Sequence, residues 1–172
     1  MTHQIKLDVL PGNQLHLFHA LSEMDWIADF YMAGGTALAL QLGHRQSIDF
    51  DFFTATSLNR EIIKKNLADL GTMELFSEDK NTINASINGI RVSFFTYDIP
   101  ILGNYLKFKK MLIAPMIDIA PMKLAAISGR GSKKDFIDLY FLLEHYELSD
   151  IFEKFQKKFI IMVDDELASM MS

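Results

Sequence analysis

A predicted strand that carries two aspartates two residues apart is the feature that most constrains this chain. The strand covers residues 48–53, and its two acids are Asp49 and Asp51. Successive side chains of a strand point to opposite faces, so both carboxylates share one face and the neighbouring apolar residues share the other. Two carboxylates on an apolar strand are costly to desolvate unless a cation or hydrogen-bond donors compensate them. A hard cation such as Mg²⁺, held by one or two carboxylates and by substrate phosphates, is a natural compensator.

A glycine turn and a short helix precede this strand. The turn is Gly34-Gly35-Thr36, and the helix is predicted over residues 36–42. The first N–H groups of a helix have no partner within the helix, and its dipole favours negative charge there, so the turn can receive phosphate oxygens. Arg45 and Ser47 border the strand. An exposed strand edge or an arginine partner also explains an isolated pair of aspartates, so an ion pair or solvent contact for Arg45 stands beside a substrate role.

Composition indicates one soluble domain. The chain has 172 residues, of which 49% are hydrophobic and 23% charged, enough apolar material for a core. The net charge of −5 gives no globally basic surface, so a nucleic-acid substrate would need a local patch. The absence of cysteine excludes disulfides, zinc–thiolate sites and thiol nucleophiles. Because no signal peptide and no membrane span is recognisable, we expect a cytoplasmic protein without a membrane partner.

The order of the predicted elements indicates an α+β fold, a mixed sheet with flanking helices and a helical C-terminal portion. We expect a single domain over residues 1–172, with an α/β core at about 1–115 and the helical portion at about 116–172. Helices are predicted at 12–29, 58–70, 118–128, 133–146 and 149–160, with a frayed tail at 164–171. Further strands are predicted at 30–33, 73–77, 82–87 and 90–97.

Local signals place several of these boundaries. Ser57 is a suitable N-cap for the helix at 58–70, and Asn88-Gly89 is the strongest short hairpin signal in the chain. Pro121 is expected in the first turn of its helix, where a proline is tolerated. The helix at 133–146 is expected to bury an apolar stripe, which consists of Phe136, Leu139, Tyr140 and Leu143.

Nucleotidyl transfer is a reaction that these residues can perform. It requires that phosphates are positioned and that developing charge is neutralised, and two cations can clamp the attacking and leaving oxygens. Asp49 and Asp51 can bridge such a pair of cations. The glycine turn and the Thr36 hydroxyl would hold the β- and γ-phosphates, and Lys123 and Arg130 would be distal cationic contacts to the triphosphate.

Two sequence elements resemble a known family. The first runs from the glycine turn through His44-Arg45-Gln46-Ser47 to Asp49-Phe50-Asp51-Phe52-Phe53. It resembles the signature of the nucleotidyltransferase superfamily, and more narrowly the AbiEii/AbiGii toxin-type nucleotidyltransferases of abortive-infection and type IV toxin–antitoxin systems. The second element resembles the same family over 118–127, then at Arg130, and then over 134–140. Together the two elements cover residues about 30–145.

The resemblance implies a nucleotidyltransferase fold and a transfer that depends on Mg²⁺ or Mn²⁺. A nucleoside triphosphate would be the substrate, and a tRNA end or a protein hydroxyl the acceptor, with a cognate antitoxin as a possible protein partner. The resemblance maps Lys123 and Arg130 to nucleotide contacts, and Lys134, Asp135 and Asp138 to the second motif, with Asp135 as a catalytic or supporting acid. First-turn acids also stabilise a helix N-terminus without any catalytic role.

The superfamily pattern also has a third carboxylate on a later strand. At the position where it is expected this chain has Ser93, and the acids that could replace it are Asp98, Asp135 and Asp138. The leading interpretation is therefore a metal-dependent nucleotidyltransferase. The alternatives are an inactive nucleotide-binding or protein-interaction module of the same fold, and, with less support, a metal nuclease.

Overall fold

The computed structural model describes residues 5–170, with side chains to residue 159, and the chain divides into two compact units. The first unit comprises Met1–Asp98 and Tyr105–Ala114, and the second comprises Ile99–Asn104 and Pro115–Ser172. We predicted a division near residue 115. The units divide between residues 114 and 115, and the short segment at 99–104 belongs with the helices that follow. Each unit is described by itself below.

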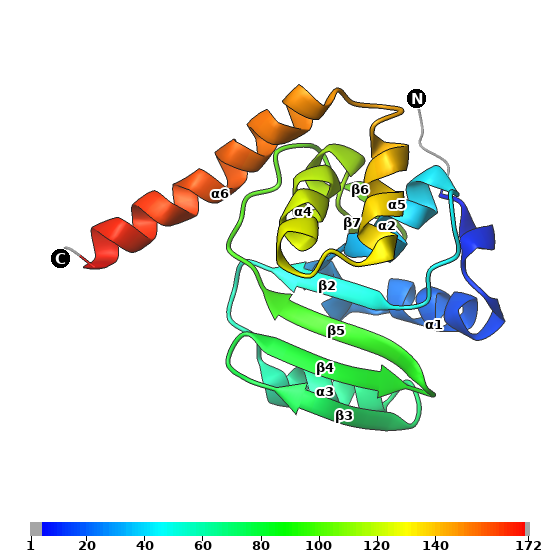
Figure 1. The fold of residues 1–172 in the computed structure, drawn as a ribbon. Coiled ribbons are helices and arrows are strands. Elements are labelled where there is room, and N and C mark those ends of the chain that lie inside the picture. The colour runs from blue at the N-terminus through cyan, green and yellow to red at the C-terminus, as the bar shows by residue number, and fades with distance from the viewer. Residues whose placement is uncertain (1–4, 171–172) are drawn as a thin grey trace. The chain divides into compact units, whose positions relative to one another are not determined.

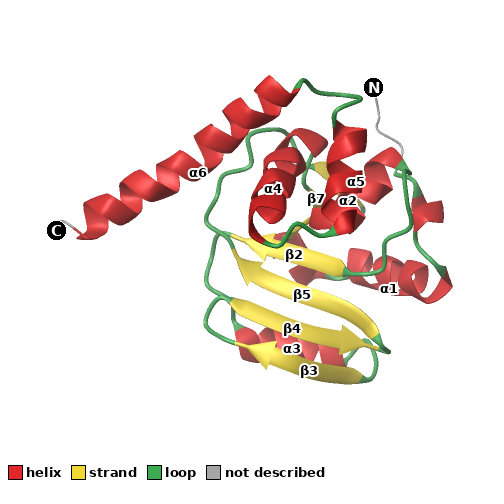
Figure 2. Ribbon diagram, in the orientation of Figure 1, coloured by secondary structure: helices red, strands yellow, loops and turns green. Residues whose placement is uncertain are grey.

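A seven-stranded mixed sheet is the framework of the first unit (Figure 1, Figure 2). Its strand order is β3-β4-β5-β2-β1-β7-β6, and β2 pairs antiparallel with β1 and parallel with β5. The strands are β1 Tyr31–Ala33, β2 Phe50–Thr54, β3 Met73–Glu78, β4 Thr82–Ile87, β5 Ile90–Thr96, β6 Leu106–Phe108 and β7 Met111–Ile113. The strand that carries the aspartate motif is therefore central and paired on both sides. The sequence did not predict β6 and β7, which have only three residues each.

Alternation along β2 places Phe50 and Phe52 on one face and Asp51 on the other, as predicted. Phe50 and Phe52 are fully buried, and the Phe52 ring stacks on Phe94 of β5 at 5.2 Å. Phe18 from the first helix lies 6.2 Å from Phe50 on the same face. Ile48, which we expected on this face, is 45% exposed because the strand begins two residues later. Burial of these rings stabilises β2 in the sheet.

Five helical segments accompany the sheet in the described part of this unit: η1 Leu7–Val9, α1 Gly12–Glu23, η2 Asp25–Asp29, α2 Gly34–Leu42 and α3 Arg60–Ala68. The predicted helix at 12–29 is wrong beyond Glu23. Met24 adopts an extended conformation, with φ −76° and ψ 135°, and separates α1 from the 3₁₀ helix η2. The N-cap of α3 is Asn59, whose side chain accepts a hydrogen bond from the Ile62 N–H, and not Ser57.

The hairpin prediction at Asn88-Gly89 is confirmed. Both residues have positive φ, 51° and 78°, which is the requirement of a two-residue type I′ turn. The turn sets β4 and β5 in an antiparallel register in which Asn84 faces Ser93. This register matters for the site, since Ser93 in turn pairs with Asp51 of β2.

Three helices form most of the second unit: α4 Met116–Gly129, α5 Lys133–Leu142 and α6 Leu148–Met170. The two predicted segments at 149–160 and 164–171 are one continuous helix as far as residue 170, and residue 171 lies outside the described residues. Pro121 lies beyond the first turn of α4, because the helix begins at Met116, two residues earlier than expected. Within the described residues, no helix is both long and apolar enough to cross a membrane.

The orientation of α5 is the largest error of the sequence-based prediction. Phe136 and Tyr140 were expected in the core but are 54% and 64% exposed. The helix instead turns two carboxylates inward, since Asp135 and Asp138 are fully buried. The apolar spacing correctly predicted a helix. The side of α5 that is buried is the one whose carboxylates contact Lys123 of α4.

A buried ion pair ties α6 to α4. Lys158 Nζ lies 2.6 Å from Asp118 Oδ1, and both side chains are completely inaccessible to solvent. Asp118 also accepts hydrogen bonds from the backbone N–H groups of Leu102 and Gly103, each at 2.8 Å. The same carboxylate therefore anchors the segment at 99–104, which explains why that segment belongs to the second unit.

We expect Lys158→Ala to lower the free energy of unfolding by about 3–5 kcal/mol, because it leaves the Asp118 carboxylate buried without its cation. Urea unfolding followed by circular dichroism would measure the change. The matched control is Lys157→Ala on the same helix, whose ion pair with Glu153 is exposed to solvent and should change stability by less than about 0.5 kcal/mol. Equal losses in the two variants would contradict the role given to the buried pair.

Candidate functional site

The glycine turn lies directly against the second aspartate of the motif. Ala33, the last residue of β1, pairs with Asp51 in the antiparallel register of β1 and β2. The next residue, Gly34, has φ +76° and begins α2. A Cβ at position 34 would lie 2.9 Å from Asp51 Oδ2, closer than side chains tolerate. The backbone conformation therefore favours glycine here, and a side chain would also displace the Asp51 carboxylate from its present position.

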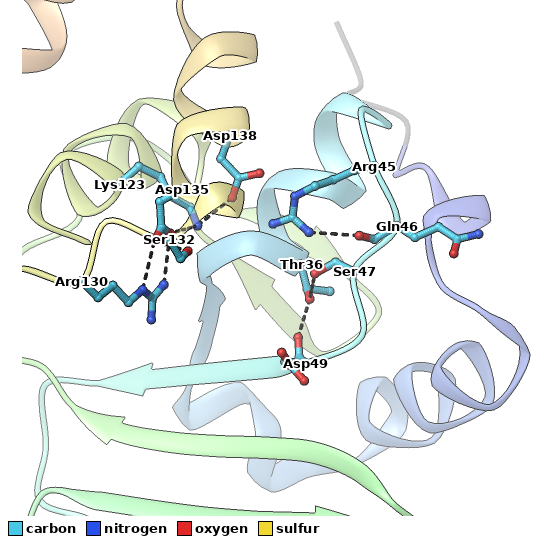
Figure 3. Close-up of polar contacts among 10 residues, drawn as sticks. All are labelled: Thr36, Arg45, Gln46, Ser47, Asp49, Lys123, Arg130, Ser132, Asp135 and Asp138. Carbon is cyan, nitrogen blue, oxygen red and sulfur yellow. Dashed lines mark hydrogen bonds and ion pairs between the residues drawn. The ribbon is translucent and has the colours of Figure 1, made fainter. Parts of the chain in front are cut away.

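The Thr36 hydroxyl connects the start of α2 to the loop that precedes β2 (Figure 3). Thr36 Oγ1 lies 2.7 Å from Ser47 Oγ and donates a hydrogen bond to the backbone carbonyl of Asp49. Thr36 and Ser47 are both buried. We predicted that this hydroxyl holds phosphate, but its contacts make it a positioning group for Asp49. No side chain caps the backbone N–H groups at the start of α2, and their predicted binding of phosphate stays a prediction.

Asp49 lies immediately before β2, one residue outside the strand on which we predicted it. It is half-buried, and within the described residues its carboxylate forms no hydrogen bond or ion pair. A partly desolvated carboxylate in that condition is well suited to a cation. Asp51 follows two positions later on β2, against Gly34.

The parallel register of β2 and β5 brings Ser93 directly beside Asp51. Asn84 of β4 follows in the same row, and its side-chain amide donates to Ser77 Oγ at 2.9 Å. The strand position at which we sought a third carboxylate is therefore correct, and it holds a hydroxyl. Asp98 is exposed and lies two residues beyond the end of β5.

No group of three or more histidine, cysteine or acidic side chains that could hold a metal forms within the described residues. Two carboxylates two residues apart still suit Mg²⁺, which is commonly held by one or two carboxylates together with substrate phosphates. The oxygen-only donor set of Asp49 and Asp51 fits a hard cation of this kind. The residues present are therefore compatible with a metal that binds together with a nucleotide.

A second polar cluster lies in the second unit, around Lys123 of α4 (Figure 3). Lys123 is buried, and its Nζ contacts Asp138 Oδ2 at 2.7 Å and Asp135 Oδ1 at 3.2 Å. Arg130 donates two hydrogen bonds to Asp135, from Nε to Oδ2 at 3.0 Å and from Nη2 to Oδ1 at 3.1 Å. Ser132 Oγ donates to Asp135 Oδ2 at 2.6 Å. The cluster contains two cations and two anions, so its formal charge is balanced.

The match to a protein-family model decides what kind of chain this is. The model describes the nucleotidyl transferase AbiEii toxin of type IV toxin–antitoxin systems, and it matches residues 16–166. The chain belongs to the AbiEii family. Both elements that resemble this family in the sequence lie within the matched range, so the predicted family is confirmed.

Known relatives of this AbiEii chain agree with the assignment. An uncharacterized protein of Aquifex aeolicus (strain VF5) is 42% identical over 142 residues, which is 76% of this chain. The chain spans 66% of the length of that relative. Among solved structures, JHP933 from Helicobacter pylori has a TM-score of 0.57 at 19% identity, over 87% of this chain and 78% of that one. ANT(2″)-Ia, crystallised with adenylyl-2″-tobramycin, has a TM-score of 0.60 at 14% identity, over 81% of this chain and 93% of that one.

These similarities confirm the predicted α+β nucleotidyltransferase fold, a mixed sheet with flanking helices and a helical C-terminal portion. The predicted site residues fall in two groups, one in each unit of this AbiEii chain. Arg45 Nη1 donates to the Gln46 carbonyl at 3.0 Å, beside the first group. Lys134 is exposed on α5. The sequence missed the contact of Asp138 with Lys123, although the spacing of Asp135 and Asp138 places both acids on one side of a helix.

Asp135 is poorly suited to act as a base in this AbiEii chain. Its two oxygens accept four hydrogen bonds, which is the full capacity of a carboxylate. The bonds from Arg130 hold the pKa of the Asp135 carboxyl well below its usual range, against the opposing effect of burial, and Ser132 and Lys123 lower it further. This geometry favours Asp135 as a residue that fixes Lys123 and Arg130 over a group that takes up a proton.

The lowered pKa of Asp135 predicts a pH-dependent stability. Its carboxyl binds protons more weakly in the folded protein than in the unfolded chain. Its contribution is therefore complete above the ordinary pKa of 3.8 and is lost as the pH falls below it. We expect Asp135→Asn to be less stable at about pH 7 and to lose less stability than the parent between about pH 5 and pH 3.

Urea unfolding at several pH values would measure this difference. The control is Asp150→Asn, which changes an exposed carboxyl in the first turn of α6 and should keep the pH dependence of the parent. A parent-like pH dependence of Asp135→Asn would contradict the assignment.

Proposed function

We propose that this AbiEii chain is a metal-dependent nucleotidyltransferase that transfers a nucleotide from a nucleoside triphosphate to a hydroxyl group. One observation carries the proposal, the close approach of the glycine turn to the carboxylate of Asp51. That contact joins the uncapped start of α2, which suits phosphate oxygens, to a pair of carboxylates that suits a hard cation. A helix start or a pair of carboxylates alone is common. Together they suit the phosphates and the metal of a metal–nucleotide complex.

Each residue of the first unit has a distinct part in this proposal. Asp49 and Asp51 hold Mg²⁺ or Mn²⁺ and are the catalytic acids. The N–H groups of Gly34, Gly35 and Thr36 bind the β- and γ-phosphates, and the Thr36 hydroxyl and Ser47 fix the loop before Asp49. The metal, when bound, supplies a positive charge that stabilises the attacking and leaving oxygens.

The family resemblance, and not the geometry, carries the assignment of further cations to the nucleotide. On that basis Arg45, Lys123, Arg130 and Lys134 contact the nucleotide. Two buried carboxylates hold Lys123 in place, so its ammonium group has a fixed position in the fold. In the proposal Asp135 and Asp138 are therefore positioning residues for this lysine.

The acceptor and the biological role rest on the family alone. The matched family consists of toxins of type IV toxin–antitoxin systems. We propose that the acceptor is the end of a tRNA or a protein hydroxyl, and that a cognate antitoxin is the protein partner. The predicted cytoplasmic location agrees with these partners and stays a prediction.

We expect Asp49→Asn combined with Asp51→Asn to abolish metal-dependent binding of nucleoside triphosphates and all transfer, because the two carboxylates are the proposed metal ligands. Titration calorimetry with each triphosphate, with and without Mg²⁺, would measure binding. Transfer of a radiolabelled nucleotide to tRNA or to protein would measure turnover. The control is Asp69→Asn, which changes an exposed acid at the end of α3. Full transfer by the folded double variant would disprove the assignment.

The serine at the third acid position favours a second candidate function, a nucleotide-binding module without turnover. Ser93→Asp distinguishes the two, since the register places the new carboxylate beside Asp51. Turnover that appears only in Ser93→Asp would identify the parent as an inactive module. Turnover in the parent at a comparable rate would establish it as an enzyme that works with two carboxylates.

A further inference from the structure

A cavity of about 310 Å³ opens in the first unit between η2, the end of β2 and α3. This volume is at the lower end of the range for small-molecule sites. Thr54, which lines it, lies on the buried face of β2 with Phe50 and Phe52, whereas Asp51 lies on the opposite face. The cavity is therefore a different site from the proposed nucleotidyltransferase centre.

The lining of the cavity combines apolar and polar side chains. Its apolar part consists of Trp26 and Phe30, together with Ile62 and Ile63 of α3. The Trp26 ring is fixed by edge contact with Phe30 at 6.2 Å and by contact with Phe94 at 5.9 Å. Ile62 is 53% exposed, so an apolar side chain of this wall remains in solvent until something covers it. A cavity lined by an indole and by aliphatic side chains is a suitable environment for a planar ring.

Polar groups at the rim suit an amino-bearing ring without phosphate. Asp29 is exposed and forms no ion pair or hydrogen bond in the part of the chain that the structure describes. Asn59 Oδ1 caps α3, which leaves its amide group as the donor it can offer, and Asn66 supplies a second carboxamide. No lysine or arginine lines the cavity, and the carboxylate of Asp29 repels anions.

We propose that this cavity binds an unphosphorylated nucleobase that carries an exocyclic amino group. The ring stacks on Trp26, the amino group donates to Asp29, and the two asparagines contact ring nitrogens or carbonyl oxygens. Such a base can come from a free nucleoside or from an unpaired position of a single-stranded RNA. The same chemistry rejects the triphosphate that the other face of β2 is proposed to bind.

The chain reports on this cavity directly, because Trp26 is its single tryptophan. Fluorescence titrations without Mg²⁺ would compare adenosine, cytidine and uridine, and adenosine with its triphosphate. We expect saturable changes with adenosine and cytidine, and binding of uridine that is weaker by about fivefold or more, as expected for the loss of one hydrogen bond. The triphosphate should also bind more weakly than adenosine, because the Asp29 carboxylate repels its phosphates. No saturable change with any nucleoside would overturn the proposal.

Variants separate this cavity from the nucleotidyltransferase site. Asp29→Asn should weaken adenosine binding by about fivefold, and Ile62→Asp should abolish it, while Asp69→Asn outside the cavity should leave it unchanged. The double variant Asp49→Asn and Asp51→Asn should bind adenosine as the parent does, whatever its transfer activity. Loss of adenosine binding in that double variant would place the ligand elsewhere and overturn the proposal.

A short all-adenosine oligoribonucleotide distinguishes the two sources of the base. Binding of the oligonucleotide as tight as or tighter than that of adenosine, and equally sensitive to Asp29→Asn, would assign the cavity to a base within RNA. Weaker binding than adenosine would assign it to a free nucleoside. An Asp29-independent fluorescence change with both ligands would contradict the proposed site.

Discussion

The approach of Gly34 to the carboxylate of Asp51 is the contact on which the first unit depends. Where Ala33 pairs with Asp51, a side chain on the next residue would place a Cβ 2.9 Å from the carboxylate oxygen and displace it. The same turn needs a positive φ to change direction from β1 into α2. The Thr36 hydroxyl then fixes the returning loop at the Asp49 carbonyl, so strand, turn and loop are determined together. The proposed site needs N–H groups for phosphate close to carboxylates for a metal. The same geometry that joins the sheet to α2 brings these groups together.

Buried ion pairs, in addition to apolar side chains, join the helices of the second unit. Lys123, Lys158 and their carboxylate partners are buried, and each ion pair must compensate a desolvation cost of several kcal/mol per ion. Hydrogen bonds beyond the pairs make this possible. Asp118 accepts two backbone N–H groups, and Asp135 accepts donors at all of its lone-pair positions. The arrangement gives little net stability against an apolar alternative, which supports the view that Lys123 is held for a function.

The sequence predicted best where local rules and burial agree. The alternation on β2 and the Asn88-Gly89 hairpin follow from side-chain period and turn conformation, and both are correct. The sequence failed on α5, where Phe136 and Tyr140 were assigned to the core and the burial of Asp135 and Asp138 was not predicted. An apolar stripe predicts burial from the free energy of transfer out of water alone. It does not account for the charge-assisted hydrogen bonds to α5, which form only in the folded protein. The family resemblance singled out Ser93, and only the structure shows that it pairs with Asp51. The cavity at Trp26 depends on how η2 departs from α1, which periodicity does not encode.

The uncharged side chains on the strands beside Asp51 affect how a metal would bind. Ser93 and Asn84 continue the row across β5 and β4 where an acid would add a third charge. With two carboxylates the site has less negative charge to hold a divalent cation, so the phosphates of the nucleotide must supply a larger share of the ligands. Each partner then binds tightly only in the presence of the other, because linkage between two ligands is reciprocal. Under the proposed function, the metal is therefore expected to bind together with the triphosphate, with the glycine turn as the proposed phosphate site.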